Sequence, residues 1–169
     1  MGVVNRLSTQ LTNRDAVPRV TNNPGTVAGM LRGFAATLET VSGDSATSTY
    51  RLARVPSNAV MHSLRVYSDD IGTTTAADFG LYDTTENGGA VVSQSLFASA
   101  VVLNAGALNG TDILYEAATA GADISDMEKP LWQQLGLSAD PKKNYDIVAT
   151  LTGAADAAAT LSIKGTYAV

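Results

Sequence analysis

The sequence contains no cysteine, and only 16% of its 169 residues are charged. Without cysteine, neither a disulfide framework nor a thiolate metal site is available. Charged residues make up about a quarter of an average globular protein, so this chain either hides much of its surface or covers it with Thr, Ser, Asn and Gly. We therefore expect stability to come from packing, with assembly into a larger body as a further source.

The chain also lacks an excess of positive charge and any long hydrophobic run. Its formal net charge is −5 and its pI is about 4.6, which provides no basic field for gripping phosphates, and we expect no nucleic-acid partner. No window approaches a membrane span, the first residues lack the apolar core of a secretory signal, and Arg6 stands where a myristoylation site requires Ser or Thr. We expect a protein made in the cytoplasm of its producing cell, with no membrane partner.

Catalytic and cofactor motifs are missing as well. No phosphate-binding or dinucleotide-binding glycine motif follows a predicted strand, and His62 is the only histidine. Its spacing places it in register with Val60, Leu64 and Val66, which is typical of a packed side chain rather than of a general base. The sequence therefore predicts no catalytic residue, no enzyme activity and no cofactor.

One set of acidic residues has the chemistry for calcium. Asp69 and Asp70 lie in one predicted loop, and Asp83 and Glu86 lie in another, so that the four carboxylates could gather at one end of a sandwich. Neither loop has the DxDxDG spacing of a calcium loop. Solvated turn acids are the preferred interpretation, and no metal site is expected.

Alternation of apolar and polar residues predicts β-strands along most of the chain. Turns are expected at Pro56-Ser57-Asn58, at Asn87-Gly88-Gly89, at Asn109-Gly110 and at 153–157. Residues 90–104 are ambiguous between strand and helix. The predicted strands are 31–41, 47–55, one that starts at Val60, one that ends near Tyr82, 111–116, 145–151 and 160–169.

One short helix is predicted, starting at Pro130 and ended by Gly136. Leu131, Trp132 and Leu135 would form its inner face, with Trp132, the only tryptophan, packed in the core. About eight strands with short connections and no βαβ alternation favour an all-β fold. We expect an antiparallel β-sandwich of jelly-roll type with one short helix.

The first 29 residues differ in character from the rest. We divide the chain into an extended N-terminal arm, 1–29, and a β-sandwich domain, 30–169. The arm holds three of the eleven basic residues, Arg6, Arg14 and Arg19, against one acid, Asp15. Its apolar residues show no sustained period, so it is either disordered or ordered by a partner. A docking arm and an ordinary frayed terminus are both open.

The tyrosines offer a second class of function. All six lie in predicted strands or at their ends, and they could line a carbohydrate-binding face, although strand tyrosines more often serve as sheet edges and interface anchors. The set comprises Tyr50, Tyr67, Tyr82, Tyr115, Tyr145 and Tyr167.

Several segments resemble the capsid cement, or decoration, proteins of tailed bacteriophages. The resemblance covers most of the chain, and its motifs are structural rather than chemical. It rests on NNPG (22–25), YRLARVPSNAVMHSLRVYSDD (50–70), ADFGLYDT (77–84), KPLWQQLGLSADP (129–141) and the terminal pair YDIVATLT (145–152) and TLSIKGTYAV (160–169).

This resemblance implies a structural virion protein that binds the outer surface of the capsid and clamps neighbouring major capsid subunits, after assembly in the host cytoplasm. Family members usually form small symmetric oligomers, so we expect a homo-oligomer, a dimer or a trimer. No motif assigns contact residues. Our hypothesis is that the arm, through Arg6, Arg14 and Arg19, contacts the capsid together with rim tyrosines. The alternative is a phage tail or fibre-associated module that binds host glycans.

Overall fold

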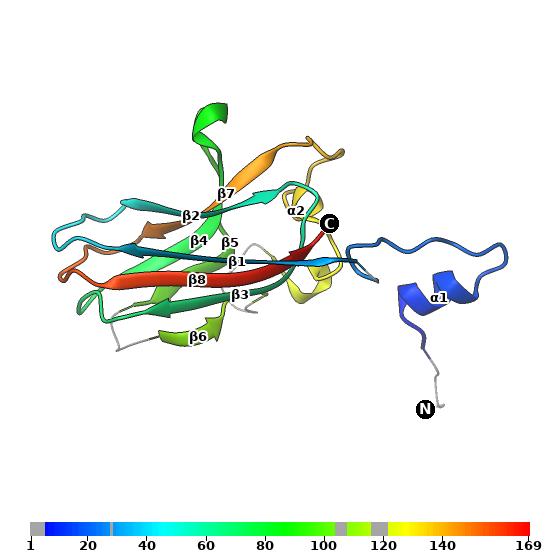
Figure 1. Ribbon diagram of the computed structural model, residues 1–169, viewed down its shortest axis with the longest axis horizontal. Helices are drawn as coiled ribbons and strands as arrows, with labels where there is room; N and C mark the ends of the chain where they lie inside the picture. The colour runs from blue at the N-terminus through cyan, green and yellow to red at the C-terminus, as the bar shows by residue number, and fades with distance from the viewer. Residues whose placement is uncertain (1–5, 28, 104–107, 116–121) are drawn as a thin grey trace, which may run out of the picture.

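The computed structural model describes residues 6–27, 29–103, 108–115 and 122–169. In these residues two four-stranded antiparallel sheets lie face to face, and the N-terminal segment extends beyond one end of them (Figure 1). The elements are α1 (Thr9–Asp15), β1 (Leu31–Glu39), β2 (Thr49–Pro56), β3 (Val60–Ser68), β4 (Ala76–Asp83), η1 (Thr85–Asn87), β5 (Val91–Val102), β6 (Leu108–Asp112), η2 (Ile124–Asp126), α2 (Leu131–Gln134), β7 (Asn144–Leu151) and β8 (Thr160–Ala168).

The strand order is β1-β8-β3-β6 in one sheet and β2-β7-β4-β5 in the other, and all the pairs are antiparallel. Among consecutive strands only β4 and β5 share a sheet, so nearly every connection crosses the sandwich. The predicted antiparallel β-sandwich is confirmed, and the interlaced order is consistent with the jelly-roll type. Residues 90–104, ambiguous in the sequence, supply strand β5 as far as Val102; residue 104 lies outside the described residues.

The core fills the space between the two sheets. Alternate residues of each strand point inward, as the period of two requires. Fully buried members from both sheets are Leu64, Val66, Phe79, Leu81, Phe97, Ile147, Leu161 and Ile163. The short helix α2 closes one end of this core with Leu131, which has no exposed surface.

The prediction for Trp132 was wrong. Helix α2 follows Pro130, and Gly136 ends it with a left-handed φ of 72°, as expected. Leu131 occupies the core, whereas the indole of Trp132 is only half-buried. Leu131 and Leu135, four residues apart, share the side of the helical turn that packs on the core, and Trp132 lies off that side.

A β-bulge overturns the predicted register of β3. Met61 pairs with Tyr167, and the next pair is Ser63 with Thr166, so His62 is the extra residue. Beyond the bulge Leu64 and Val66 point into the core, but His62 points outward and is exposed. A bulge adds one residue and so reverses the alternation that places a side chain on one face. His62 is therefore a surface residue rather than a packed one.

A second bulge replaces the turn expected at Asn109-Gly110. β6 spans Leu108–Asp112, and its pairing with β3 shifts between Val66 and Tyr67, opposite Gly110. Gly110 has a φ of 81°, a conformation that suits a glycine in a bulge as well as one in a turn. The predicted strand 111–116 is therefore displaced toward the N-terminus, and residue 116 lies outside the described residues.

The arm contains a helix, α1, that the sequence analysis did not predict. The Ser8 hydroxyl caps it by accepting a hydrogen bond from the Leu11 N–H at 3.4 Å, and Arg14 in its last turn complements the helix dipole. The expectation of one short helix was thus wrong. None of the helices in the described residues is long and apolar enough to cross a membrane.

Candidate docking arm and the adjoining groove

The arm folds back on itself. After α1 the chain reverses, and the Val20 N–H donates to the Asn13 carbonyl oxygen at 3.1 Å. The Asn13 side-chain amide donates to Asn22 Oδ1 at 2.9 Å, and the Asn22 amide donates to the Gln10 carbonyl oxygen at 3.1 Å. The segment that follows α1 therefore bonds back to the helix, through Val20 and Asn22.

Several apolar side chains of the arm are exposed. Val17 is 97% exposed and Leu7 63%, while Leu11 and Val20 are exposed to a lesser degree. No residue of α1 is buried. Each of these side chains gains stability when a partner buries it. We name the set Leu7, Leu11, Val17 and Val20 the arm surface.

The base of the arm is fixed to the sandwich. Gly25 is buried, and its carbonyl oxygen lies 3.2 Å from His62 Nε2. A Cβ at Gly25 would come within 2.8 Å of a Val60 methyl carbon, so only glycine fits this contact without a shift. Farther along the arm, the Gln10 amide donates to Glu128 Oε1 at 3.0 Å. The arm is therefore placed by contacts at its base, through Gly25, and at α1, through Gln10.

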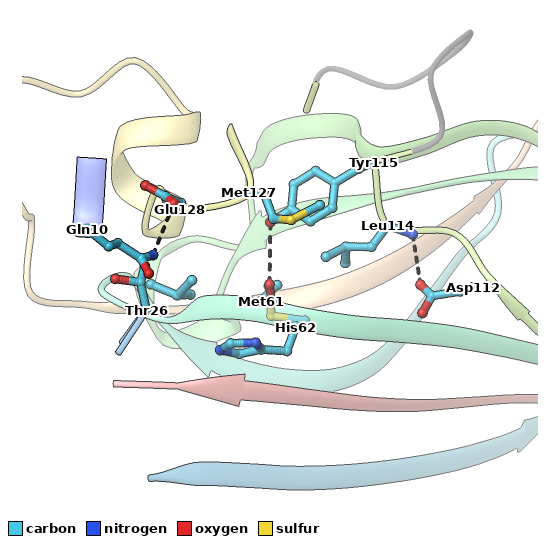
Figure 2. A pocket seen from close by; sticks show the side chains of 10 residues that line it. Gln10, Thr26, Met61, His62, Asp112, Leu114, Tyr115, Met127 and Glu128 are labelled. Atoms are coloured by element: carbon cyan, nitrogen blue, oxygen red, sulfur yellow. Dashed lines mark hydrogen bonds between the residues drawn. The ribbon is translucent and has the colours of Figure 1, made fainter. Parts of the chain in front are cut away.

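A groove of about 390 Å³ lies between the arm and the sandwich. Figure 2 shows Gln10 bonded to Glu128 on one side and Tyr115 bonded to the Met61 backbone on the other, with His62 below. Its walls come from the arm, the start of β3, the end of β6 and the segment before α2. The lining residues are Gln10, Thr26, Val60, Met61, His62, Asp112, Leu114, Tyr115, Met127 and Glu128.

The polar groups of the groove are committed to structural bonds. Asp112 Oδ1 accepts the Leu64 N–H at 3.3 Å and the Leu114 N–H at 3.1 Å. The Tyr115 hydroxyl donates to the Met61 carbonyl oxygen at 3.4 Å, and burial raises the pKa of Tyr115. These bonds hold backbone segments in place, so the groove offers a shaped surface rather than an acid-base pair.

The three predicted contact residues all lie on the arm and are all exposed. Arg6 precedes the arm surface, Arg14 lies on α1, and Arg19 follows Val17 and Pro18. The Arg14 guanidinium pairs with Asp15 at 3.3 Å, and both side chains are largely in water, so this pair adds little stability. In the sequence the arginines stand beside the members of the arm surface, whose exposure the sequence analysis did not predict. Ser8 followed by Leu11 was the available signal for α1.

The acidic residues considered for calcium do not converge. Asp70 precedes β4 and Asp83 ends it, which separates them by roughly 20 Å along an eight-residue strand. Asp83 binds Lys143 at 2.5 Å, and Glu86 binds Arg54 at 3.2 Å. Within the part of the chain that the structure describes, no group of three or more His, Cys, Asp or Glu side chains could hold a metal ion.

The tyrosines do not form one binding face. Tyr82 and Tyr145 are buried in the sandwich. Tyr50 lies in β2 of one sheet, where its hydroxyl donates to Asp44 at 2.5 Å, whereas Tyr67 and Tyr167 lie in the other sheet. Only Tyr115 lines the groove. The described tyrosines therefore do not line a single carbohydrate-binding face.

Comparison with known proteins connects the fold to phage capsids. No protein-family model and no curated protein matches the sequence. A chain in the solved structure titled "Cyanophage Pam1 capsid asymmetric unit" aligns with a TM-score of 0.53 and 15% identity, over 92% of this chain and 96% of that one. A chain of the acidic stable capsid structure of Helicobacter pylori bacteriophage KHP30 aligns with a TM-score of 0.43 and 15% identity, over 83% and 94%. At this identity the Pam1 likeness establishes a shared fold.

Proposed function

We propose that this protein is a structural component of a bacteriophage virion that binds the outer surface of the capsid and clamps neighbouring major capsid subunits as a cement protein. The protein acts by binding, with neither catalysis nor a cofactor. The fold shared with a chain of a phage capsid structure, along nearly the whole length of both chains, supports the capsid part of the proposal.

The exposure of the arm surface is the observation that supports the clamping role. This surface projects beyond the end of the sandwich (Figure 1), and its leucine and valine side chains are exposed. Burying one such side chain against a partner contributes about 1.5–3 kcal/mol. The exposed arginines of the arm can form charge-assisted hydrogen bonds with carboxylates at the edge of an apolar docking site on a major capsid subunit. Many copies, each adding a modest contact, then strengthen the shell through multivalency.

Co-sedimentation of the full-length protein with matching capsid shells tests the proposal. Leu7→Ser with Val17→Ser removes the two most exposed side chains of the arm surface, and we expect binding at least about tenfold weaker. Val91→Ser is the matched control, because Val91 is 55% exposed on β5 of the sandwich, and it should bind like the unaltered protein. Replacing Arg6, Arg14 and Arg19 with Gln should weaken binding most at low salt.

The outcomes separate the parts of the proposal. Failure of the unaltered protein to sediment with shells would overturn the cement role, and measurable glycan binding by the same protein would then favour the tail or fibre module. Full-strength binding by the Leu7→Ser/Val17→Ser protein would refute the arm as the docking element. Deleting residues 1–29 is a less clean test, because Gly25 packs on Val60 and helps to complete the sandwich.

A further inference from the structure

Three of the four edge strands carry features that prevent pairing with another strand. β2 has a bulge after Arg51 and ends in Pro56. β5 pairs with β4 through repeated register shifts, and Ala100 has a left-handed φ of 52°. β6 has only five residues and contains the Gly110 bulge. Proteins use such irregularities to block edge-to-edge association.

Strand β1 has none of these features. It runs for nine residues in unbroken register with β8, and it contains no proline. The ladder continues past its end, where the Thr40 N–H donates to the Ala159 carbonyl oxygen at 2.8 Å. In the described residues no strand pairs with its other side. A regular edge strand directs every second N–H and C=O outward, and because Thr40 bonds toward β8, the outward positions of β1 are Leu31, Gly33, Ala35, Thr37 and Glu39.

The contacts of the arm's described residues, 6–27 and 29, lead away from this edge. From β1 the arm passes over β8, where a Cβ at Gly29 would lie 3.3 Å from Ala168, and reaches β3, where Gly25 meets Val60. Gln10 of α1 then contacts Glu128 beside the groove. These contacts follow the sheet order β1-β8-β3 and therefore lead away from the free side of β1.

The residues around β1 are complementary to a second copy of the same strand. Leu31 is 60% exposed and Val41 is 63% exposed, and each lies five residues from Ala36 in the sequence. In antiparallel pairing about a twofold axis at Ala36, Leu31 of one copy faces Val41 of the other, twice. On the inner face Phe34 of one copy lies opposite Leu38 of the other, and both side chains are only partly buried in the single chain.

We propose that two copies of this chain pair through their β1 edges, antiparallel and in the register centred on Ala36, to form a dimer with one continuous sheet. A second copy suits the edge better than an unrelated strand, because it continues both faces across the junction, with Phe34, Ala36 and Leu38 on the inner face and Gly33, Ala35 and Thr37 on the outer face. The small side chains of Ala35 and Ala36 at the centre allow close approach. This inference stands independently of shell binding.

Sedimentation equilibrium of the purified full-length protein over a concentration series tests the dimer. Leu31→Lys places a lysine opposite Val41 of the second copy, and we expect dimerisation at least about tenfold weaker. Adding Val41→Glu should restore much of the lost affinity, because each lysine then meets a glutamate of the other copy. Within one chain these positions lie about 33 Å apart, so the rescue cannot arise intramolecularly.

Leu31→Lys with Val91→Glu is the matched control, because it has the same charges but places the acid on β5, and it should remain as weak as Leu31→Lys alone. Hydrogen exchange should show β1 amides gaining protection as the dimer forms. A monomer or trimer mass, a dimer insensitive to Leu31→Lys, or equal rescue by Val91→Glu would each overturn the proposal. Shell co-sedimentation is a separate assay, so failure of the dimer and failure of the cement role are distinguishable.

Discussion

Replacing Asp146, the only carboxylate in β2 and β7, with Asn should destabilise the fold. Asp146 lies in β7 with its side chain 9% exposed. Its Oδ2 accepts a hydrogen bond from Arg51 Nη1 at 2.9 Å, and its Oδ1 accepts one from Arg54 Nε at 2.8 Å. The carboxylate thus holds two guanidinium groups against one face of the sheet.

The expected loss in the free energy of unfolding follows from the hydrogen bonds that the arginine partners keep after the exchange. Arg51 also donates to the carbonyl oxygens of Asp83 and Gly89, both at 2.8 Å, so it stays in place beside an uncharged amide. A hydrogen bond between charged groups contributes about 1.5–3 kcal/mol, and the 30% exposure of the Arg51 side chain reduces this through solvent screening. We expect Asp146→Asn to lower the free energy of unfolding by about 2 kcal/mol. The corresponding fall in Tm is about 4–8 °C.

Urea denaturation followed by the fluorescence of Trp132, the only tryptophan, measures this loss. Glu86→Gln is the matched control, because Glu86 also binds Arg54, at 3.2 Å, but is 74% exposed; its cost should stay within about 0.5 kcal/mol. A stability of Asp146→Asn within about 0.5 kcal/mol of the unaltered protein, or an equal loss for Glu86→Gln, would refute the reasoning from burial.

Two further predictions concern packing and pH. Gly165→Ala should lower the free energy of unfolding by about 1–3 kcal/mol, because the added Cβ would lie 2.4 Å from a ring carbon of Phe34. Gly33→Ala on the neighbouring strand, where no atom lies nearer than 4.0 Å, should lower it by less than about 0.5 kcal/mol. Equal losses of the two variants in urea denaturation would contradict this. The hydrogen bond from Lys129 lowers the pKa of Asp126 below its ordinary 3.8. The ionised Asp126 therefore stabilises the fold fully above about pH 4, and this stabilisation is lost as the pH falls below that. Asp126→Asn should make the acid dependence of stability shallower, and an unchanged slope would contradict this prediction.

Alternation in the sequence was sufficient to predict most of the sandwich, and the errors fall where the backbone departs from regular pairing. His62 was placed on the wrong face because one extra residue in β3 reverses the alternation, and a bulge has no sequence signature of its own. Gly110 carried a true signal for a positive φ, but that signal does not distinguish a turn from a bulge. Strand boundaries near such residues depend on tertiary pairing.

The division at residue 29 stays a prediction from composition, and the exposed surface of the arm could not be predicted from the sequence. Composition separates residues 1–29 from the rest, and charge singles out Arg6, Arg14 and Arg19. The sequence analysis did not predict helix α1, because seven residues are too few to show a helical period. Hydrogen bonds with Asn22, which lies beyond the end of the helix, also hold it in place. The exposure of the leucines and valines beside those arginines depends on how the arm folds back, which no local pattern specifies.

The two proposals together give the clamp a geometry. Antiparallel pairing of β1 edges places the two arms at opposite ends of the joined sheets, since each arm precedes its own Leu31 and that residue lies beside Val41 of the other copy. Two docking arms on one rigid body bind two shell subunits at once, and the second contact then benefits from a high effective concentration. Leu31→Lys, which leaves the arm surface intact, should therefore weaken binding to whole shells more than binding to an isolated shell subunit.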